Sequence, residues 1–167
     1  DIEILELKKG EFFIEKDKTC RHFAFIASGI MRAFDIDNGN EITTCLCSEN
    51  TFATSTISFI TQTPSNINIQ ALSDATLLTI RYEKLNDLYK KSDFWLQVGK
   101  VIMEQEFISL QQEVWNSIKS PDEKYLTLIR ENPVILQQVP LRHIASYLRI
   151  TPETLSRVRK RTSRYIS

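Results

Sequence analysis

The N-terminal half of the chain alternates apolar and polar positions with the two-residue period of β-strands. Phe23, Phe25 and Ala27 share one face of such a run, and residues 67–71 alternate in the same way. Asn38-Gly39 lies between two further runs and predicts a tight hairpin, because both residues tolerate a positive φ. Short strands separated by turn signals predict an antiparallel barrel or sandwich.

The period becomes helical after residue 81, and from Asp93 to about Ile118 it predicts one long helix with Ser92 or Asp93 as its N-cap. Two apolar stripes run along this helix. The first has the alternating four- and three-residue spacing of a coiled-coil seam and consists of Phe94, Val98, Val101, Gln105, Ile108, Gln112 and Trp115. The second consists of Trp95, Ile102, Met103, Phe107, Leu110 and Val114.

A helix that is apolar on two faces needs two partners. We expect the second stripe to pack on the barrel and the seam to pair with a second copy of the chain. The two glutamines of the seam would weaken this pairing but help to fix its register. Burial of the whole helix in a single core is the alternative.

A new helix is predicted at Pro121, because proline at the first helical position behind a serine N-cap is a favoured start. The boundary to a small helical domain therefore lies between Lys119 and Ser120. The chain divides into a strand-rich region at residues 1–91, the long helix at residues 92–119 and a C-terminal helical domain at residues 120–167.

Two short helices are predicted near the C-terminus. The first covers residues 141 to about 148 and points Ile144 and Ala145 inward. The second begins at Thr151, a good N-cap, with Pro152 at the first helical position, where a missing N–H has no helical partner to lose. The few residues between them give the spacing of a helix-turn-helix.

The second of these helices presents polar side chains to solvent. With Leu155 and Val158 pointing inward, Glu153, Ser156 and Arg157 face outward and suit the edges of bases. Arginine pairs with guanine through two hydrogen bonds, and glutamate accepts one from the amino group of cytosine. The other residues expected to contact DNA are Arg142, Thr151, Thr154, Arg159, Lys160 and Arg161, and Arg149 and Arg164 also suit phosphates.

The charge distribution agrees with a DNA partner for the C-terminal domain alone. The chain of 167 residues has no net charge, but residues 1–119 hold 12 Lys/Arg and 17 Asp/Glu, whereas residues 120–167 hold 9 and 4. A basic region on a neutral chain indicates a local polyanionic partner, although a solvated basic helix face is the alternative. Arg149 stands where the turn of this motif often has glycine, and a positive φ there would cost about 1 kcal/mol.

The order of strands, long helix and C-terminal helix-turn-helix resembles the bacterial CRP/FNR transcription regulators. The most specific stretch is RHIASYLRITPETLSRVRK, whose Glu153, Ser156 and Arg157 match the recognition-helix residues that read the DNA half-site in the FNR branch. TQTPSNINIQAL resembles the phosphate cassette of a divergent branch that is common in Bacteroidetes.

This resemblance implies an α+β fold with three parts: an N-terminal antiparallel double-stranded β-roll (jelly roll), a long central dimerisation helix and a C-terminal winged helix-turn-helix. It also implies a homodimer that places two recognition helices in successive major grooves of a palindromic site. The wing would have to come from residues 131–140, ahead of the helix-turn-helix.

The phosphate cassette departs from that of cyclic-nucleotide-binding members, in which a glutamate takes the ribose hydroxyl and an arginine neutralises the cyclic phosphate. The matching positions here are Thr54-Ser55-Thr56 and Ser65-Asn66. A buried phosphate without a cation is costly, so we expect no control by cyclic AMP. Either there is no effector, or Thr54, Ser55, Ser65 and Asn66 line a pocket for a different small ligand. The purely structural interpretation is that these residues cap a turn and begin a strand.

Other chemistry has weaker support in the sequence. Cys20-x-His22 and Cys45-x-Cys47 could supply zinc ligands from adjacent strands, but buried apolar thiols are the favoured interpretation, so no metal or cofactor is predicted. The histidines are the only bases with a pKa near neutrality, and His143 is expected at the surface or near phosphates, so catalysis is not expected. An odd number of cysteines fits a reducing cytoplasm.

The sequence therefore predicts a cytoplasmic homodimeric transcription regulator that is not an enzyme. Its expected partners are double-stranded DNA, a second copy of the chain and RNA polymerase, with an effector of unknown identity and no membrane contact. Two alternatives stay open. One is a regulator that depends on another small ligand in the β-roll, and the other is a dimeric interaction module that does not bind DNA.

Overall fold

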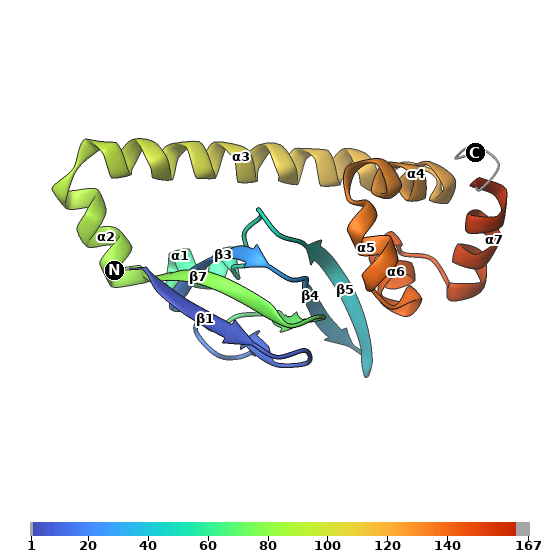
Figure 1. The fold of residues 1–167 in the computed structure, drawn as a ribbon, viewed down its shortest axis with the longest axis horizontal. Helices are drawn as coiled ribbons and strands as arrows, with labels where there is room; N and C mark the ends of the chain where they lie inside the picture. The colour runs from blue at the N-terminus through green and yellow to red at the C-terminus, as the bar shows by residue number, and fades with distance from the viewer. Residues whose placement is uncertain (1, 163–167) are drawn as a thin grey trace.

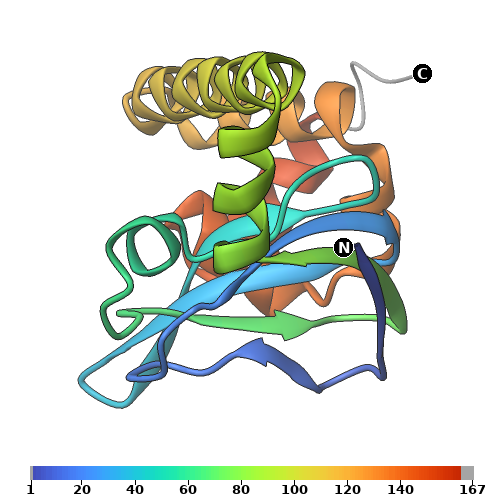
Figure 2. The ribbon, with the colours of Figure 1, turned by 90° about the vertical axis from the view of Figure 1, so that its left-hand side faces the viewer.

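Two antiparallel sheets face each other and form a β-roll (Figures 1 and 2). The computed structural model describes residues 2–162. One sheet has the order β1-β7-β3, with β1 at Glu3–Leu7, β7 at Ala75–Arg81 and β3 at His22–Ser28. The other has the order β2-β6-β4-β5, with β2 at Phe12–Ile14, β6 at Asn68–Ala71, β4 at Met31–Asp37 and β5 at Asn40–Cys47. The predicted antiparallel β-roll is confirmed.

Strands β4 and β5 form the hairpin that Asn38-Gly39 predicted. Asp37 pairs with Asn40, and Asn38 and Gly39 both have positive φ, 49° and 80°. The register of this pair shifts between Ala33 and Phe34, which leaves Thr44 without an opposite residue. A β-bulge of this kind bends a strand locally.

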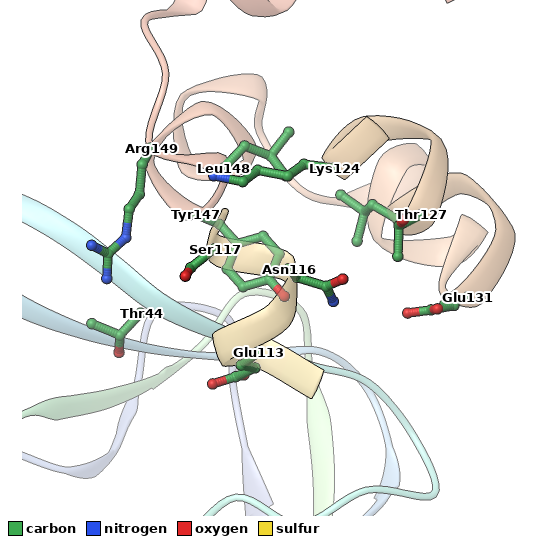
Figure 3. Close-up of a pocket in the computed structure, with 11 residues that line it drawn as sticks. Thr44, Glu113, Asn116, Ser117, Lys124, Thr127, Glu131, Tyr147, Leu148 and Arg149 are labelled. Atoms are coloured by element: carbon green, nitrogen blue, oxygen red, sulfur yellow. The ribbon is translucent and has the colours of Figure 1, made fainter. Parts of the chain in front are cut away.

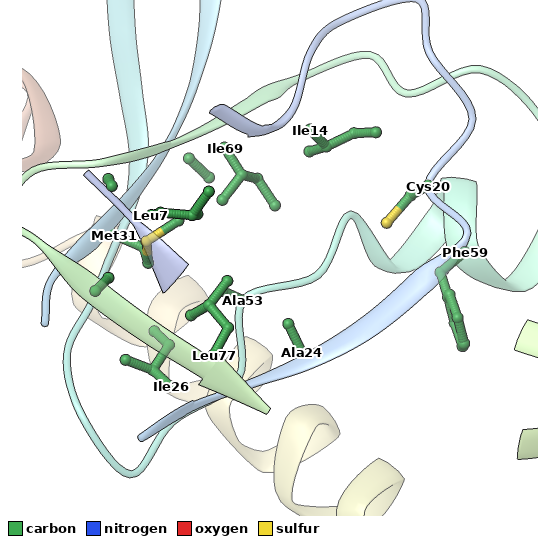
Figure 4. Packing of buried hydrophobic residues seen from close by; sticks show 13 residues of the cluster. Leu7, Ile14, Cys20, Ala24, Ile26, Met31, Ala53, Phe59, Ile69 and Leu77 are labelled. Atoms are coloured by element: carbon green, nitrogen blue, oxygen red, sulfur yellow. The ribbon is translucent and has the colours of Figure 1, made fainter. Parts of the chain in front are cut away.

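The core of the β-roll lies between the two sheets, as Figure 4 shows. On β3 it is Ala24 and Ile26 that point into this core, while the opposite face carries Phe23 and Phe25. Both phenylalanine rings pack on Phe52, with centroid distances of 4.9 and 5.6 Å. The predicted period of two is therefore correct, and the larger side chains lie on the outer face.

Three helices follow or interrupt the strands: α1 at Thr56–Thr61, α2 at Tyr82–Lys91 and α3 at Asp93–Ser117. The long helix α3 runs along one side of the molecule (Figure 1), and its bounds agree with the prediction from the sequence. Gly99 is the buried residue of α3, and a Cβ at this position would lie 2.6 Å from the hydroxyl oxygen of Tyr89 on α2. Among the described helices, none is both long and apolar enough to cross a membrane.

The C-terminal region is helical throughout its described part: α4 at Pro121–Glu131, α5 at Pro133–Gln138, α6 at Leu141–Leu148 and α7 at Pro152–Thr162. The predicted start of α4 is confirmed, since the Ser120 hydroxyl accepts from the Glu123 N–H and the Glu123 carboxylate accepts from the Ser120 N–H.

The expectation of a wing within residues 131–140 is wrong, because this segment forms α5 and, up to residue 162, the helical region has no strand. Pro133 occupies the first turn of α5. Ile135 and Val139 lie four residues apart and both are buried, so a helical turn places both side chains in the core.

Candidate nucleic-acid interface

The turn between α6 and α7 is closed by main-chain hydrogen bonds. Arg149 has φ 56° and ψ 44°, the left-handed conformation. Its N–H donates to the Ser146 carbonyl, and the Ile150 N–H donates to the Ala145 carbonyl, each at 3.0 Å. This Schellman arrangement is usually completed by glycine. The sequence correctly located this turn, and Arg149 adopts the positive φ that was expected to be unfavourable for it.

Helix α7 begins and packs as the sequence predicted. The Thr151 hydroxyl accepts from the Thr154 N–H at 3.2 Å, and Pro152 is the first helical residue. Leu155 is 1% exposed and Val158 is fully buried. These two side chains fix which face of α7 is turned away from the protein.

That outward face carries the predicted base-reading residues. Glu153, Ser156 and Arg157 are exposed, whereas Thr154 is half-buried and bonded to Thr151. Hydrogen bonds from its own backbone N–H and from the Thr151 hydroxyl lower the pKa of Glu153. The carboxylate is therefore charged at neutral pH, which is the form that accepts hydrogen bonds only. The face thus presents an acceptor, a hydroxyl and a guanidinium within about one helical turn.

The basic residues flanking this face differ in their surroundings. Arg159 and Lys160 are exposed on α7. The Arg161 guanidinium binds both carboxylate oxygens of Asp122 on α4, with its Nη2 at 2.7 and 2.9 Å. Arg142 places its Nε 3.3 Å from the Nε2 of His143. Arg164 lies outside the described residues. A phosphate contact by Arg161 would have to compete with the Asp122 pair.

Arg149 does not lie on the α7 face. It lines a cavity of about 130 Å³ between α3, α4, α6 and β5, and Figure 3 shows its side chain extending toward Thr44. Glu113 of α3 lines the same cavity, and burial, together with Glu106, raises the pKa of Glu113. In this arrangement the Arg149 guanidinium faces the β-roll.

The helix-turn-helix and the β-roll share one hydrophobic core. Ile30, Leu46 and Leu72 of the β-roll belong to the same buried cluster as the inward residues of α4 to α7. In addition, the N–H of Thr43 on β5 donates to the hydroxyl of Ser146 on α6 at 2.9 Å. The core of the described helices α4 to α7 therefore continues onto the β-roll.

A buried arginine on β4 contacts residues of both the β-roll and the helix-turn-helix. The Arg32 side chain is 4% exposed, donates to Gln70 and pairs with the Glu41 carboxylate at 2.7 Å. Its guanidinium carbon lies 3.9 Å from the ring centroid of Phe34. Its Nη1 lies 2.9 Å from the Nδ1 of His143 on α6. Because arginine only donates, a hydrogen bond from Arg32 to Nδ1 requires an Nδ1 without a proton, which is a neutral His143.

The expectation that His143 lies at the surface is wrong. The residue is 6% exposed, and burial together with the Arg32 and Arg142 charges lowers its pKa to about 4. The sequence did not point to Arg32 or its role, since Arg32 and His143 are 111 positions apart. The one local signal was a charged residue between the apolar residues Met31 and Ala33.

The proposed effector residues form two separate arrangements. Ser55 and Ser65 are buried and hydrogen-bonded to each other at 2.8 Å, and Ser65 also donates to the Ile67 carbonyl. Thr54 accepts from the Ala24 N–H, and Asn66 is exposed. None of these four residues lines the cavity at Arg149. These contacts agree with the purely structural interpretation, in which the residues close a turn ahead of β6.

The predicted seam of α3 is largely exposed. Among its seven residues Val98 is half-buried, and the exposed ones are Phe94, Val101, Gln105, Ile108, Gln112 and Trp115. Phe94 and Trp115, near the two ends of α3, are 65% and 66% exposed. The expectation that the second stripe packs on the barrel is wrong for Met103, Phe107, Leu110 and Val114, which are exposed as well. The single-core alternative is wrong for the same reason.

Comparison with known proteins identifies the fold. FixK2 of Bradyrhizobium japonicum matches with a TM-score of 0.83 and 13% identity over 99% of this chain and 86% of that one. The c-di-GMP-responsive regulator CLP of Xanthomonas campestris matches with a TM-score of 0.74 and 14% identity over 97% and 86%. A protein of Eubacterium rectale, described as a regulator of the CRP/FNR family, matches with a TM-score of 0.73 and 19% identity over 98% and 79%. The fold is that of the CRP/FNR transcription regulators.

The family follows from the sequence match of the β-roll. Residues 4–92 match the cyclic nucleotide-binding domain, so the chain belongs to this family. No curated protein matches the chain. The predicted resemblance to the CRP/FNR regulators is thereby confirmed, whereas the loss of the phosphate and ribose contacts stays a prediction from the sequence.

Proposed function

We propose that this protein is a sequence-specific DNA-binding transcription regulator that binds a palindromic site as a homodimer and is not controlled by cyclic AMP. The observation that carries the proposal is the exposed face of α7. Its Glu153, Ser156 and Arg157 stand on a helix anchored by Leu155 and Val158, within the fold of transcription regulators. The named structural matches are regulators, which also favours a protein without catalytic activity.

The three exposed residues suit the major groove. Arg157 can donate two parallel hydrogen bonds to a guanine, and Glu153, charged at neutral pH, can accept from a cytosine amino group. The Ser156 hydroxyl can donate or accept. We expect the phosphate contacts around this face to come from Arg142, Thr151, Thr154, Arg159 and Lys160. Arg161 can contact phosphate as well once its ion pair with Asp122 is broken.

The exposed stripe of α3 supports the homodimer. Large apolar side chains at Phe94, Val101, Ile108 and Trp115 face solvent in the single chain, and a contiguous apolar patch of this size usually marks an interface. Pairing two α3 helices would relate the two α7 helices by a two-fold axis, which suits inverted half-sites one helical turn apart.

The contacts of Ser55 and Ser65 support independence from cyclic AMP. The two hydroxyl groups are already bonded to each other, and the residues match the ribose position (Ser55) and the phosphate position (Ser65) of the family's cassette. A cyclic nucleotide would have to break that bond and would gain no cation from Ser65 or Asn66. The proposal further includes a cytoplasmic location and contact with RNA polymerase.

The base-reading role is tested with two arginine variants on α7. Arg157→Ala should weaken binding to a specific duplex by about 1–3 kcal/mol and leave binding to random duplex nearly unchanged. Arg159→Ala is the matched control, because a phosphate contact should be lost equally on both duplexes. Fluorescence anisotropy at two salt concentrations measures both. Equal losses on specific and random DNA for Arg157→Ala would refute base reading.

The dimer is tested by light scattering at micromolar concentration. Wild-type protein should have the mass of two chains, and Ile108→Glu within the seam should shift it to one chain. Lys100→Glu, an exposed position on α3 outside both apolar stripes, is the control and should leave the mass unchanged. A wild-type monomer would overturn the pairing of α3.

A further inference from the structure

Two free thiols on β5 are in direct contact. Cys45 and Cys47 have their sulfur atoms 3.2 Å apart, and both residues are half-buried against the core of the β-roll. Residues i and i+2 of a strand share a face and have Cα atoms about 6.6 Å apart, close to the upper limit of about 6.8 Å for a disulfide. The pair therefore needs a local bend, rather than a rearrangement, to become a bond.

The residue between these thiols anchors the helix-turn-helix. Leu46 points to the opposite face of β5 and belongs to the hydrophobic cluster shared with α4 to α7. It pairs in register with Arg32, whose guanidinium contacts His143 on α6. A bend at Leu46 would thus act on both contacts, the apolar and the polar one, that fix α6 on the β-roll.

We infer that Cys45 and Cys47 are a reversible dithiol–disulfide pair, and that their oxidation by a small-molecule disulfide loosens the junction between the β-roll and the helix-turn-helix. A disulfide at the limit of the allowed Cα separation is strained and therefore easily reduced, which is the property of regulatory rather than structural bonds. Closure of the bond requires the two sulfur atoms to approach by about 1 Å, to the S–S length of about 2.05 Å.

The exchange proceeds in two balanced steps. The hydrogen bond with Cys47 and burial raise the pKa of the Cys45 thiol, and Glu113 and Glu106 act in the same direction. Cys45 therefore stays protonated, and the Cys47 sulfur, after losing its proton to solvent, attacks one sulfur of the small disulfide and releases a small thiolate. The Cys45 sulfur then attacks Cys47 of the mixed disulfide, and its proton leaves with the second small thiol. Two protein thiols are oxidised and one small disulfide is reduced to two thiols.

The test of the pair uses the full chain in anaerobic mixtures of reduced and oxidised glutathione, followed by acid quenching, alkylation and mass spectrometry. The expected product has lost the mass of two hydrogens within the peptide that contains both cysteines, with Cys20 still alkylated. Cys20→Ser should oxidise like the wild type, and Cys45→Ala and Cys47→Ala should not close a bond. Thiols that stay alkylated throughout, a stable glutathione adduct or a bond to Cys20 would each overturn the pair.

The effect on the junction is measured by amide hydrogen exchange, which does not depend on DNA binding. Oxidation should speed exchange in α6, reversibly on adding dithiothreitol, and leave β1 unchanged. The same oxidation of Cys47→Ala is the control and should have no effect. Unchanged exchange in α6 of the oxidised wild type would overturn the coupling.

The consequence for DNA rests on the function proposed above. Oxidation should change the affinity for a specific duplex at least about fivefold, the usual lower range of coupling between two sites. If the bond closes and α6 loosens but reduced protein binds no DNA, the proposed function fails and the thiol pair stands. If reduced protein binds DNA with an affinity that oxidation does not change, the coupling to DNA binding is refuted.

Discussion

Lowering the pH should weaken the junction at His143. Its folded pKa of about 4 lies below the ordinary value of 6.5, mainly because of burial and then because of the Arg32 and Arg142 charges, while Glu41 acts in the opposite direction. The unfolded chain takes up a proton on His143 as the pH falls through 6.5, whereas the folded chain takes it up only near 4. The contribution of His143 to the free energy of unfolding therefore falls across this window and changes no further below it.

The magnitude follows from the linkage between protonation and folding. For one histidine with these two pKa values, moving from pH 7.5 to pH 5 removes about 2 kcal/mol from the free energy of unfolding. The loss arises mainly because His143 would have to carry its charge in a buried position. There it would also face the Arg32 guanidinium, whose Nη1 is 2.9 Å from Nδ1. That donor would lose its acceptor and gain a like charge.

The assay is urea unfolding, followed by circular dichroism at the two pH values, for wild type and His143→Asn. The asparagine amide oxygen can replace Nδ1 as the acceptor for Arg32 and does not titrate. The burial-lowered pKa of His22 contributes to the pH dependence of both proteins and cancels in the comparison. The wild type should lose about 2 kcal/mol more than the variant. Equal losses in the two proteins would refute the neutral, buried His143.

Three further pairs of variants test particular contacts, each measured by the free energy of unfolding. Arg149→Gly should be about 1 kcal/mol more stable than Arg149→Ala, because only glycine relieves the positive φ at the turn; equal stability would contradict that strain. Leu155→Ala should cost about 2–5 kcal/mol, against under about 1 kcal/mol for the exposed Leu141→Ala, and similar costs would place Leu155 outside the core. Gly29→Ala should cost more than about 2 kcal/mol, because its Cβ would meet the Asp74 carbonyl oxygen at 2.6 Å. Gly10→Ala is the control and should cost about 1 kcal/mol, because Gly10 has a similar positive φ but no such contact.

The helix-turn-helix could be predicted because its signals are local. Thr151, Pro152, Leu155 and Val158 lie within about two helical turns, and each acts on the start or the inward face of the same helix. The hairpin at Asn38-Gly39 was predictable for the same reason. Local turn chemistry was sufficient for both elements.

The junction between the two regions could not be predicted because its contacts are remote in sequence. Arg32 and His143 have no local feature that links them, and Leu46 reads as an ordinary strand residue. The wing was expected from the family resemblance, but Pro133 and the spacing of Ile135 and Val139 favour the helix that forms there. Helix α1 was missed because TISFIT is rich in strand-forming residues, and its buried Ser58 and Phe59 hold it against the barrel through tertiary contacts.

The central claim is that α7 reads a palindromic DNA site without help from cyclic AMP. Its most direct test is selection of bound duplexes from a random pool by the full-length protein under reducing conditions, with and without cyclic AMP. The account predicts one consensus in both conditions, made of two inverted half-sites about one helical turn apart. A consensus that appears only with cyclic AMP, or no enrichment in either condition, would contradict it.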